Sequence, residues 1–107
     1  MLDVVVDRET WYRGEGTGES KLLRHDGQKC CIGFLAIKLG ACRKDLLDID
    51  ILDDVAVNAT LKFRDKHDGG LAEAYEVNDD IDITEAEREA QLIIIGQKMN
   101  VNFSFIN

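Results

Sequence analysis

The pattern of apolar and polar positions predicts a strand near each end of the chain. Leu2–Val6 is a short run of apolar, mostly β-branched residues, which is typical of a buried strand. Near the other end, Val101, Phe103 and Phe105 alternate with polar residues, and this period of two is typical of a half-buried strand. We therefore expect residues 101–106 to form a terminal strand, and its exposed edge would suit pairing between two copies of the chain.

Two longer segments predict helices. Residues 30–39 are apolar apart from one glycine and one lysine, and Gly40 follows as a natural helix end because glycine adopts positive φ freely. Residues 85–99 carry a wide apolar face. Thr84 and Glu87 precede and open this second segment with the spacing of a capping box, in which each side chain bonds to the backbone of the other residue.

The middle of the chain follows a different pattern. Across residues 55–64 apolar side chains occupy every second position, which indicates a half-buried strand. Residues 65–70 include two glycines and would form the turn after it, whereas residues 71–77 suit either a returning strand or a short helix. Earlier in the chain, residues 21–24 suit a strand, and residues 25–28 contain an Asp-Gly pair that favours a tight turn.

Together these patterns predict one α+β domain over residues 1–107, with a small antiparallel sheet packed on two main helices at about residues 30–39 and 85–99. A chain of 107 residues is long enough for one modest hydrophobic core. No apolar run approaches the ~20 residues that a membrane span needs, and the first residues lack the basic and apolar regions of a signal peptide. We therefore expect a cytoplasmic protein with no membrane partner.

The charge is distributed unevenly along the chain. The net charge is −8, but residues 1–40 carry six acids and six bases, so the whole excess lies in residues 41–107. An acidic field repels nucleic acid and anionic membranes and attracts basic surfaces. We therefore expect a protein partner with a basic surface and no direct contact with nucleic acid, with solubility alone as the alternative explanation. The acids expected to contribute are Asp48, Asp50, Asp53, Asp54, Asp79, Asp80 and Asp82.

One short segment combines aromatic and basic residues, Trp11, Tyr12 and Arg13. Tryptophan, tyrosine and arginine are enriched at the energetic centres of protein interfaces, so these residues are candidates for partner binding. The alternative is a tryptophan anchored in the core, with the arginine stem packed over it and its charged group in water. The sequence leaves both interpretations open.

Cys30 and Cys31 stand side by side where the first predicted helix begins. A helix N-terminus stabilises a thiolate, and His25 is close enough in sequence to act as its base, so thiol-dependent catalysis is one interpretation. The other is two inert cysteines in the core, which the apolar residues after them favour. The cysteines and histidines lack the paired spacing of structural zinc sites, so no metal and no cofactor are expected. We therefore expect a protein that is not an enzyme, with a thiol-dependent enzyme as the alternative.

Several segments of the chain resemble a family of small proteins encoded by bacteriophages and prophages. They are Arg8–Gly16 (R-x-x-W-x-R-G-E-G), Ser20–Arg24 (S-x-L-L-R), Gly27–Phe34 (G-x-K-C-C-x-G-F), Val77–Asp79 and Glu87–Ala90. The family has no established activity, so the resemblance carries over no catalytic residue. It implies a phage accessory protein that acts inside an infected bacterium, where such small acidic proteins often inhibit host defence or nucleic-acid-handling complexes. The expected function is thus binding and inhibition of a host protein. A further alternative is a structural accessory protein that forms a homodimer.

Overall fold

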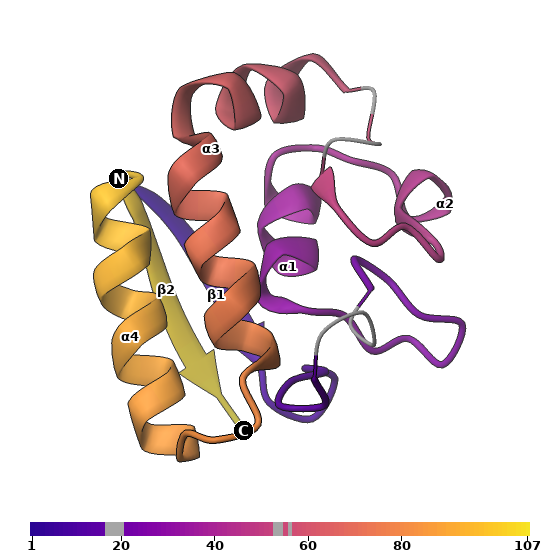
Figure 1. Ribbon diagram of the computed structural model, residues 1–107. Coiled ribbons are helices and arrows are strands. Elements are labelled where there is room, and N and C mark those ends of the chain that lie inside the picture. The colour runs from indigo at the N-terminus through magenta and orange to yellow at the C-terminus, as the bar shows by residue number, and fades with distance from the viewer. Residues whose placement is uncertain (17–20, 53–54, 56) are drawn as a thin grey trace.

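The structure is a computed structural model that describes residues 1–16, 21–52, 55 and 57–107. Its elements, in chain order, are β1 (Leu2–Asp7), α1 (Cys31–Lys38), α2 (Arg43–Leu46), α3 (Asn58–Asp79), α4 (Glu85–Lys98) and β2 (Val101–Ile106). The helix α4 packs on β2, and α3 lies between α4 and α1 (Figure 1). The α+β class expected from the sequence is confirmed. No helix in the described ranges is long and apolar enough to span a bilayer.

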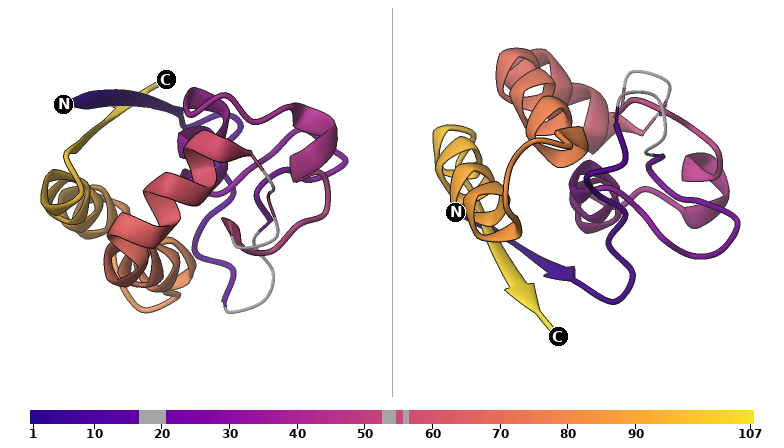
Figure 2. Two further views of the ribbon diagram at one scale, coloured as in Figure 1. Left: turned by 90° about the horizontal axis from the view of Figure 1, so that it is seen from above. Right: turned by 60° about the horizontal axis from the view of Figure 1, so that its bottom comes forward.

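The two strands form a parallel sheet, so the antiparallel sheet expected from the sequence is wrong. Leu2 pairs with Val101 and Asp7 with Ile106, and both strands run in the same direction (Figure 2). Parallel strands need a long crossover connection, and here the helices α1, α2, α3 and α4 lie between the two strands along the chain. A period of two marks a strand without showing its direction, and this explains the error. Pairing of β2 between two copies stays a prediction.

Residues 58–79 form the 22-residue helix α3, so the strand predicted over 55–64 and the turn predicted over 65–70 are wrong. Residues 71–77, left open between strand and helix, are helical. The chain passes through both glycines as helix, and the backbone leaves helical geometry at His67, where φ is −128° and ψ is 26°. Ten of the 22 residues are leucine, alanine, lysine, arginine or glutamate, which favour a helix, and the burial pattern does not follow the alternation.

Residues 21–24 do not form the expected strand. Leu23 makes a single parallel bridge with Leu47, the N–H of Leu22 donates to the carbonyl of Ile49 at 2.8 Å, and the segment continues no further as a strand. The turn expected at residues 25–28 is present, because the N–H of Arg24 donates to the carbonyl of Gln28 at 2.7 Å. The segment therefore bonds to the end of α2 and the α2–α3 connector and is not part of the sheet.

The end of α1 follows the sequence signal. Gly40 has a φ of 102°, and its N–H donates to the carbonyl of Ile37 at 3.0 Å. The N–H of Ala41 reaches back to the carbonyl of Ala36 at 3.0 Å. These two bonds satisfy the last carbonyls of the helix in the manner of a Schellman motif, which requires a positive φ at the glycine.

The start of α4 also follows its signal, but its buried face differs from expectation. The N–H of Glu87 donates to the Thr84 hydroxyl at 3.1 Å, and the Glu87 carboxylate accepts from the Thr84 N–H at 3.3 Å, which completes the capping box. Ile94 is 55% exposed, whereas Arg88 is 2% exposed. A fully buried arginine is rare unless it is paired, and for this reason apolar periodicity did not find it.

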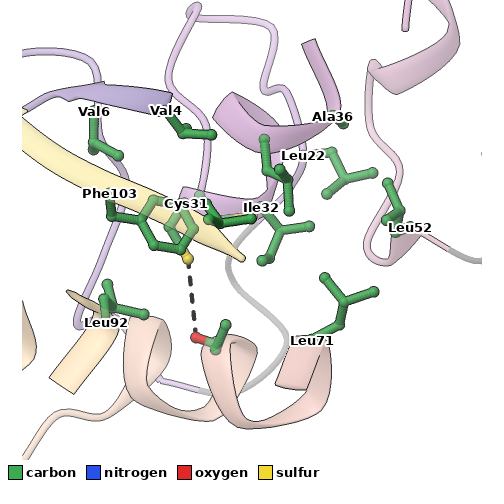
Figure 3. Packing of buried hydrophobic residues seen from close by; sticks show 14 of the residues in the cluster. Val4, Val6, Leu22, Cys31, Ile32, Ala36, Leu52, Leu71, Leu92 and Phe103 are labelled. Atoms are coloured by element: carbon green, nitrogen blue, oxygen red, sulfur yellow. Dashed lines mark hydrogen bonds between the residues drawn. The ribbon is translucent and has the colours of Figure 1, made fainter. Parts of the chain in front are cut away.

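The core lies between the inner face of the sheet and the helices α1, α3 and α4 (Figure 3). The side chains that meet there include Val4, Val6, Ile32, Leu71, Leu92 and Phe103. Cys31 belongs to the same cluster, and its thiol donates a long hydrogen bond of 3.9 Å to the carbonyl of Ala74 in α3. The predicted helix at residues 30–39 is thus confirmed as a central core helix, with bounds Cys31–Lys38.

Candidate functional site

Asn78 lies near the end of α3, is fully buried and joins three segments of the chain. Its Oδ1 accepts hydrogen bonds from the Trp11 indole N–H at 2.8 Å and from the Cys31 backbone N–H at 3.0 Å. Its Nδ2 donates to the carbonyl of Tyr12 at 3.1 Å. Burial of an amide costs free energy unless its groups are hydrogen-bonded, and here they are bonded. These bonds hold the end of α3 against the start of α1.

Arg88 extends this arrangement from α4. Its Nη1 donates to the carbonyls of Val77 at 2.6 Å and Asn78 at 3.1 Å, and its Nε lies 3.4 Å from the carboxylate of Glu85. The guanidinium therefore bonds to carbonyls at the C-terminal, negative end of α3. Gly14 packs directly against it, because a Cβ at Gly14 would come within 2.9 Å of Nη2. We call Trp11, Tyr12, Gly14, Cys31, Asn78 and Arg88 the Asn78 network.

The candidate binding residues Trp11, Tyr12 and Arg13 take different positions. Trp11 is 3% exposed and belongs to the core, as in the alternative in which the tryptophan is anchored there. The Arg13 guanidinium lies 4.4 Å from the centre of the Trp11 ring and forms an ion pair with Glu85. Tyr12 is half-buried, and the guanidinium of Arg24 lies 4.0 Å from its ring centre. Tyr12 and Arg13 thus keep part of their surface accessible, and Trp11 holds the segment in place.

Three of the predicted acids, Asp79, Asp80 and Asp82, lie together in and beside the α3–α4 connector. Asp79 and Asp80 line one of two neighbouring depressions that share Glu76, and the Asp82 N–H donates to the Asp80 carboxylate. The first, of about 250 Å³ between α3 and α4, is lined by Glu73, Glu76, Val77, Gln91, Ile94 and Ile95. The second, of about 330 Å³, is lined by Gly16, Glu76, Asp79, Asp80 and Ile81. We call Glu73, Glu76, Asp79, Asp80 and Asp82 the acidic face.

The connector at the acidic face is held by hydrogen bonds that involve its backbone. The N–H of Gly16 donates to the carbonyl of Asp79 at 3.0 Å, and the Asp80 carboxylate accepts from the Asp82 N–H at 2.8 Å. Between these points Ile81 is 68% exposed, and Ile94 is 55% exposed on the α4 side of the first depression. The acidic face therefore combines carboxylates with two accessible aliphatic side chains on an ordered backbone.

Asp48 and Asp50 lie in the α2–α3 connector, which is apart from the acidic face (Figure 1). Asp50 forms an ion pair with Lys21, and the N–H of Asp48 donates to the carbonyl of Leu23 at 2.8 Å. These contacts tie both residues to the segment at 21–24. The predicted acids Asp53 and Asp54 lie outside the described residues.

Sequence reasoning missed Glu73 and Glu76 because residues 71–77 were left open between strand and helix. Their spacing of three places both on one face of a helix, so the signal becomes visible once α3 is recognised as helical. Ile81 and Ile94 were also missed. Ile81 lies in the connector. Ile94 lies on α4, where the apolar face is wider than the part of the helix that is buried.

Cys30 and Cys31 are both buried, at 1% and 0% exposure. Burial raises the pKa of the Cys30 thiol to about 12 and raises the pKa of the Cys31 thiol well above its ordinary value. His25 is exposed in the turn at 25–28, and neither thiol bonds to it in the part of the chain that the structure describes. A thiol that stays protonated is a poor nucleophile, so this arrangement lends no support to thiol catalysis.

These positions predict selective labelling of the cysteines. In the folded protein at neutral pH, iodoacetamide is expected to modify Cys42, which is exposed, and to leave Cys30 and Cys31 unmodified. Mass spectrometry of intact and digested protein measures this, with the urea-unfolded chain as the control in which all three thiols react. Rapid labelling of Cys30 in the native protein would contradict the burial described above.

No family model, no curated protein and no solved structure matches the chain. The resemblance to phage-encoded proteins therefore stays an expectation. The residues that carry it nevertheless meet in space: Trp11, Gly14, Cys31, Asn78 and Arg88 come from its separate segments and all belong to the Asn78 network. The resembling segments thus mark what holds the fold together, and the acidic face lies beside them.

Proposed function

We propose that the protein is a non-enzymatic binding protein whose acidic face holds a basic surface of a host protein inside an infected bacterium. The observation that carries this is the position of Glu76, which joins two depressions into one surface of carboxylates with Ile81 and Ile94 exposed at its edges. Carboxylates steer a basic partner and fix its register, and burial of aliphatic side chains contributes affinity.

The same surface explains how binding would inhibit. Proteins that handle nucleic acid hold its phosphates with basic clefts, and a chain with a net charge of −8 competes for such a cleft. The order imposed by the Asn78 network supports this role, because a preorganised surface loses little conformational entropy on binding. The phage setting itself rests on the resemblance of the sequence.

Charge reversal on the acidic face tests the proposal. We expect Glu73→Lys with Glu76→Lys to weaken capture of the host partner at least tenfold, because both carboxylates line the first depression. The matched control is Asp65→Lys with Asp68→Lys, which makes the same change in net charge elsewhere on α3 and should retain the partner. The measurement is a pull-down from lysate of the infected host, quantified by mass spectrometry.

Salt dependence supplies the second criterion. Capture by the wild-type protein should fall steeply between about 0.1 M and 0.5 M salt, because screening weakens attraction between exposed charges. The proposal fails if both double variants lose the partner equally, which would show an effect of net charge alone. It also fails if capture does not depend on salt.

A further inference from the structure

The strand β1 has an edge with free backbone donors. The N–H groups of Leu2 and Arg8 donate to carbonyls at the two ends of β2, at 3.0 and 2.9 Å. Because successive residues of a strand direct their N–H groups to opposite sides, those of Asp3 and Val5 point away from β2. Within the described ranges, no protein group accepts a hydrogen bond from either of them. An edge of this kind can accept a further strand.

A groove of about 290 Å³ runs along β1 and α1. Its basic and apolar lining residues are Val4, Val5, Lys29, Phe34, Ile37, Lys38 and Arg43, and among the described residues Asp3 is the one acid that lines it. Val5 is 51% exposed there. We call this the basic groove. It is a local concentration of positive charge on a protein whose net charge is −8.

Lys29 is the unusual residue of the basic groove. Lys29 is only 7% exposed, and its Nζ lies 4.5 Å from the centre of the Phe34 ring. Among the described residues, no carboxylate or carbonyl accepts a hydrogen bond from this ammonium group. Burial lowers the pKa of Lys29, Arg43 lowers it further, and Asp7 opposes them. Its ammonium group is not fully buried and lies at the wall of the basic groove, so an incoming carboxylate can reach it and pair with it.

We propose that the basic groove binds an extended acidic and apolar peptide segment of a partner protein, which adds to β1 as a strand and places a carboxylate at Lys29. Strand addition supplies affinity through the free backbone groups of Asp3 and Val5, and alternate side chains of the segment supply specificity. Its apolar residues would cover Val5 and Phe34, and its acids would meet the basic residues of the groove. This surface is opposite in charge to the acidic face and independent of it.

A second copy of this chain suits the edge less well. If two β1 strands paired antiparallel around Val5, Asp3 of one copy would stand opposite Asp7 of the other. Like charges directly opposite each other destabilise a strand pair. A partner segment with carboxylates placed against Lys29, Lys38 and Arg43 avoids this repulsion. The acidic peptide is therefore the occupant that the charges favour.

Two blocked five-residue peptides test the proposal, one alternating valine with glutamate and the other alternating valine with lysine. With ¹⁵N-labelled protein, the glutamate peptide should shift the amide signals of Asp3 and Val5 and slow their hydrogen exchange, and the lysine peptide should not. Lys29→Met should weaken binding of the glutamate peptide at least tenfold, because it removes the ammonium charge from the groove while keeping a similar length. Lys66→Met, an exposed lysine on α3, is the matched control and should leave binding unchanged.

If Lys29→Met does not fold, Lys38→Met with Arg43→Met replaces it, since both side chains are exposed and should weaken binding several-fold. The proposal is overturned if the glutamate peptide leaves the amides of Asp3 and Val5 unprotected, or if both peptides bind equally. It is also overturned if these signals move with protein concentration when no peptide is present, because the occupant would then be a second copy.

Discussion

Replacing Asn78 with leucine is expected to lower the free energy of unfolding by about 4 kcal/mol or more. Leucine fills a similar volume but neither accepts nor donates, so the Trp11 indole N–H, the Cys31 N–H and the Tyr12 carbonyl all lose their bond to this side chain. Each buried group left unsatisfied costs about 1–3 kcal/mol. Because a small domain is stable by only about 5–15 kcal/mol, this variant should lose about a quarter or more of its stability.

Urea titration followed by the fluorescence of Trp11, the chain's single tryptophan, measures the effect directly. The control is Asn58→Leu, the same substitution at an exposed residue at the start of α3, which should change stability by less than about 0.5 kcal/mol. Equal urea midpoints for Asn78→Leu and the wild type would show that the Asn78 network contributes little to stability.

Gly33→Ala is expected to destabilise the protein by about 3 kcal/mol. A Cβ at this position would lie 2.0 Å from the carbonyl oxygen of Leu22 and 2.9 Å from the Cβ of Lys29. The first of these is a backbone atom, and the N–H of the same residue is bonded to Ile49, so the segment cannot move aside without losing that contact. The glycine is required here by the close approach of α1 to a neighbouring backbone.

The matched substitution Gly69→Ala should have the opposite sign. Gly69 lies within α3, and a Cβ there would meet no atom within 4 Å. Alanine in a helix is more stable than glycine by about 0.5–1 kcal/mol, so this variant should unfold at a higher temperature than the wild type. Thermal unfolding of both variants by circular dichroism checks the pair, and a Gly33→Ala protein as stable as Gly69→Ala would refute the steric argument.

What the sequence predicted well depends on contacts between near neighbours. The capping box at Thr84 and Glu87 and the helix end at Gly40 each involve residues a few positions apart, and the structure confirms both. The direction of the strands is set instead by pairing across 99 positions, from Asp3 to Asn102, which no local pattern encodes. The helix at 58–79 was misread because a short alternation outweighed the helix-forming composition around it.

The candidate site was predicted less completely, for related reasons. Composition located the negative charge after residue 40, but only the fold shows that Asp79 and Asp80 line a depression with Glu76 while Asp50 pairs with Lys21 elsewhere. Arg88 was hidden because a buried arginine contradicts apolar periodicity. Its partners are carbonyls at the end of another helix, and sequence reasoning cannot place those without the tertiary structure.

The parallel pairing of β1 and β2 has a mechanical consequence. The chain enters the sheet at the start of β1 and leaves it at the end of β2, and these two points lie at opposite ends of the sheet (Figure 1). A force that pulls the two ends apart therefore acts along the strands and loads all the hydrogen bonds of the ladder together. In an antiparallel pair the same force would open the bonds one after another. Unfolding by such a force is therefore expected to require rupture of the whole β1–β2 ladder at once.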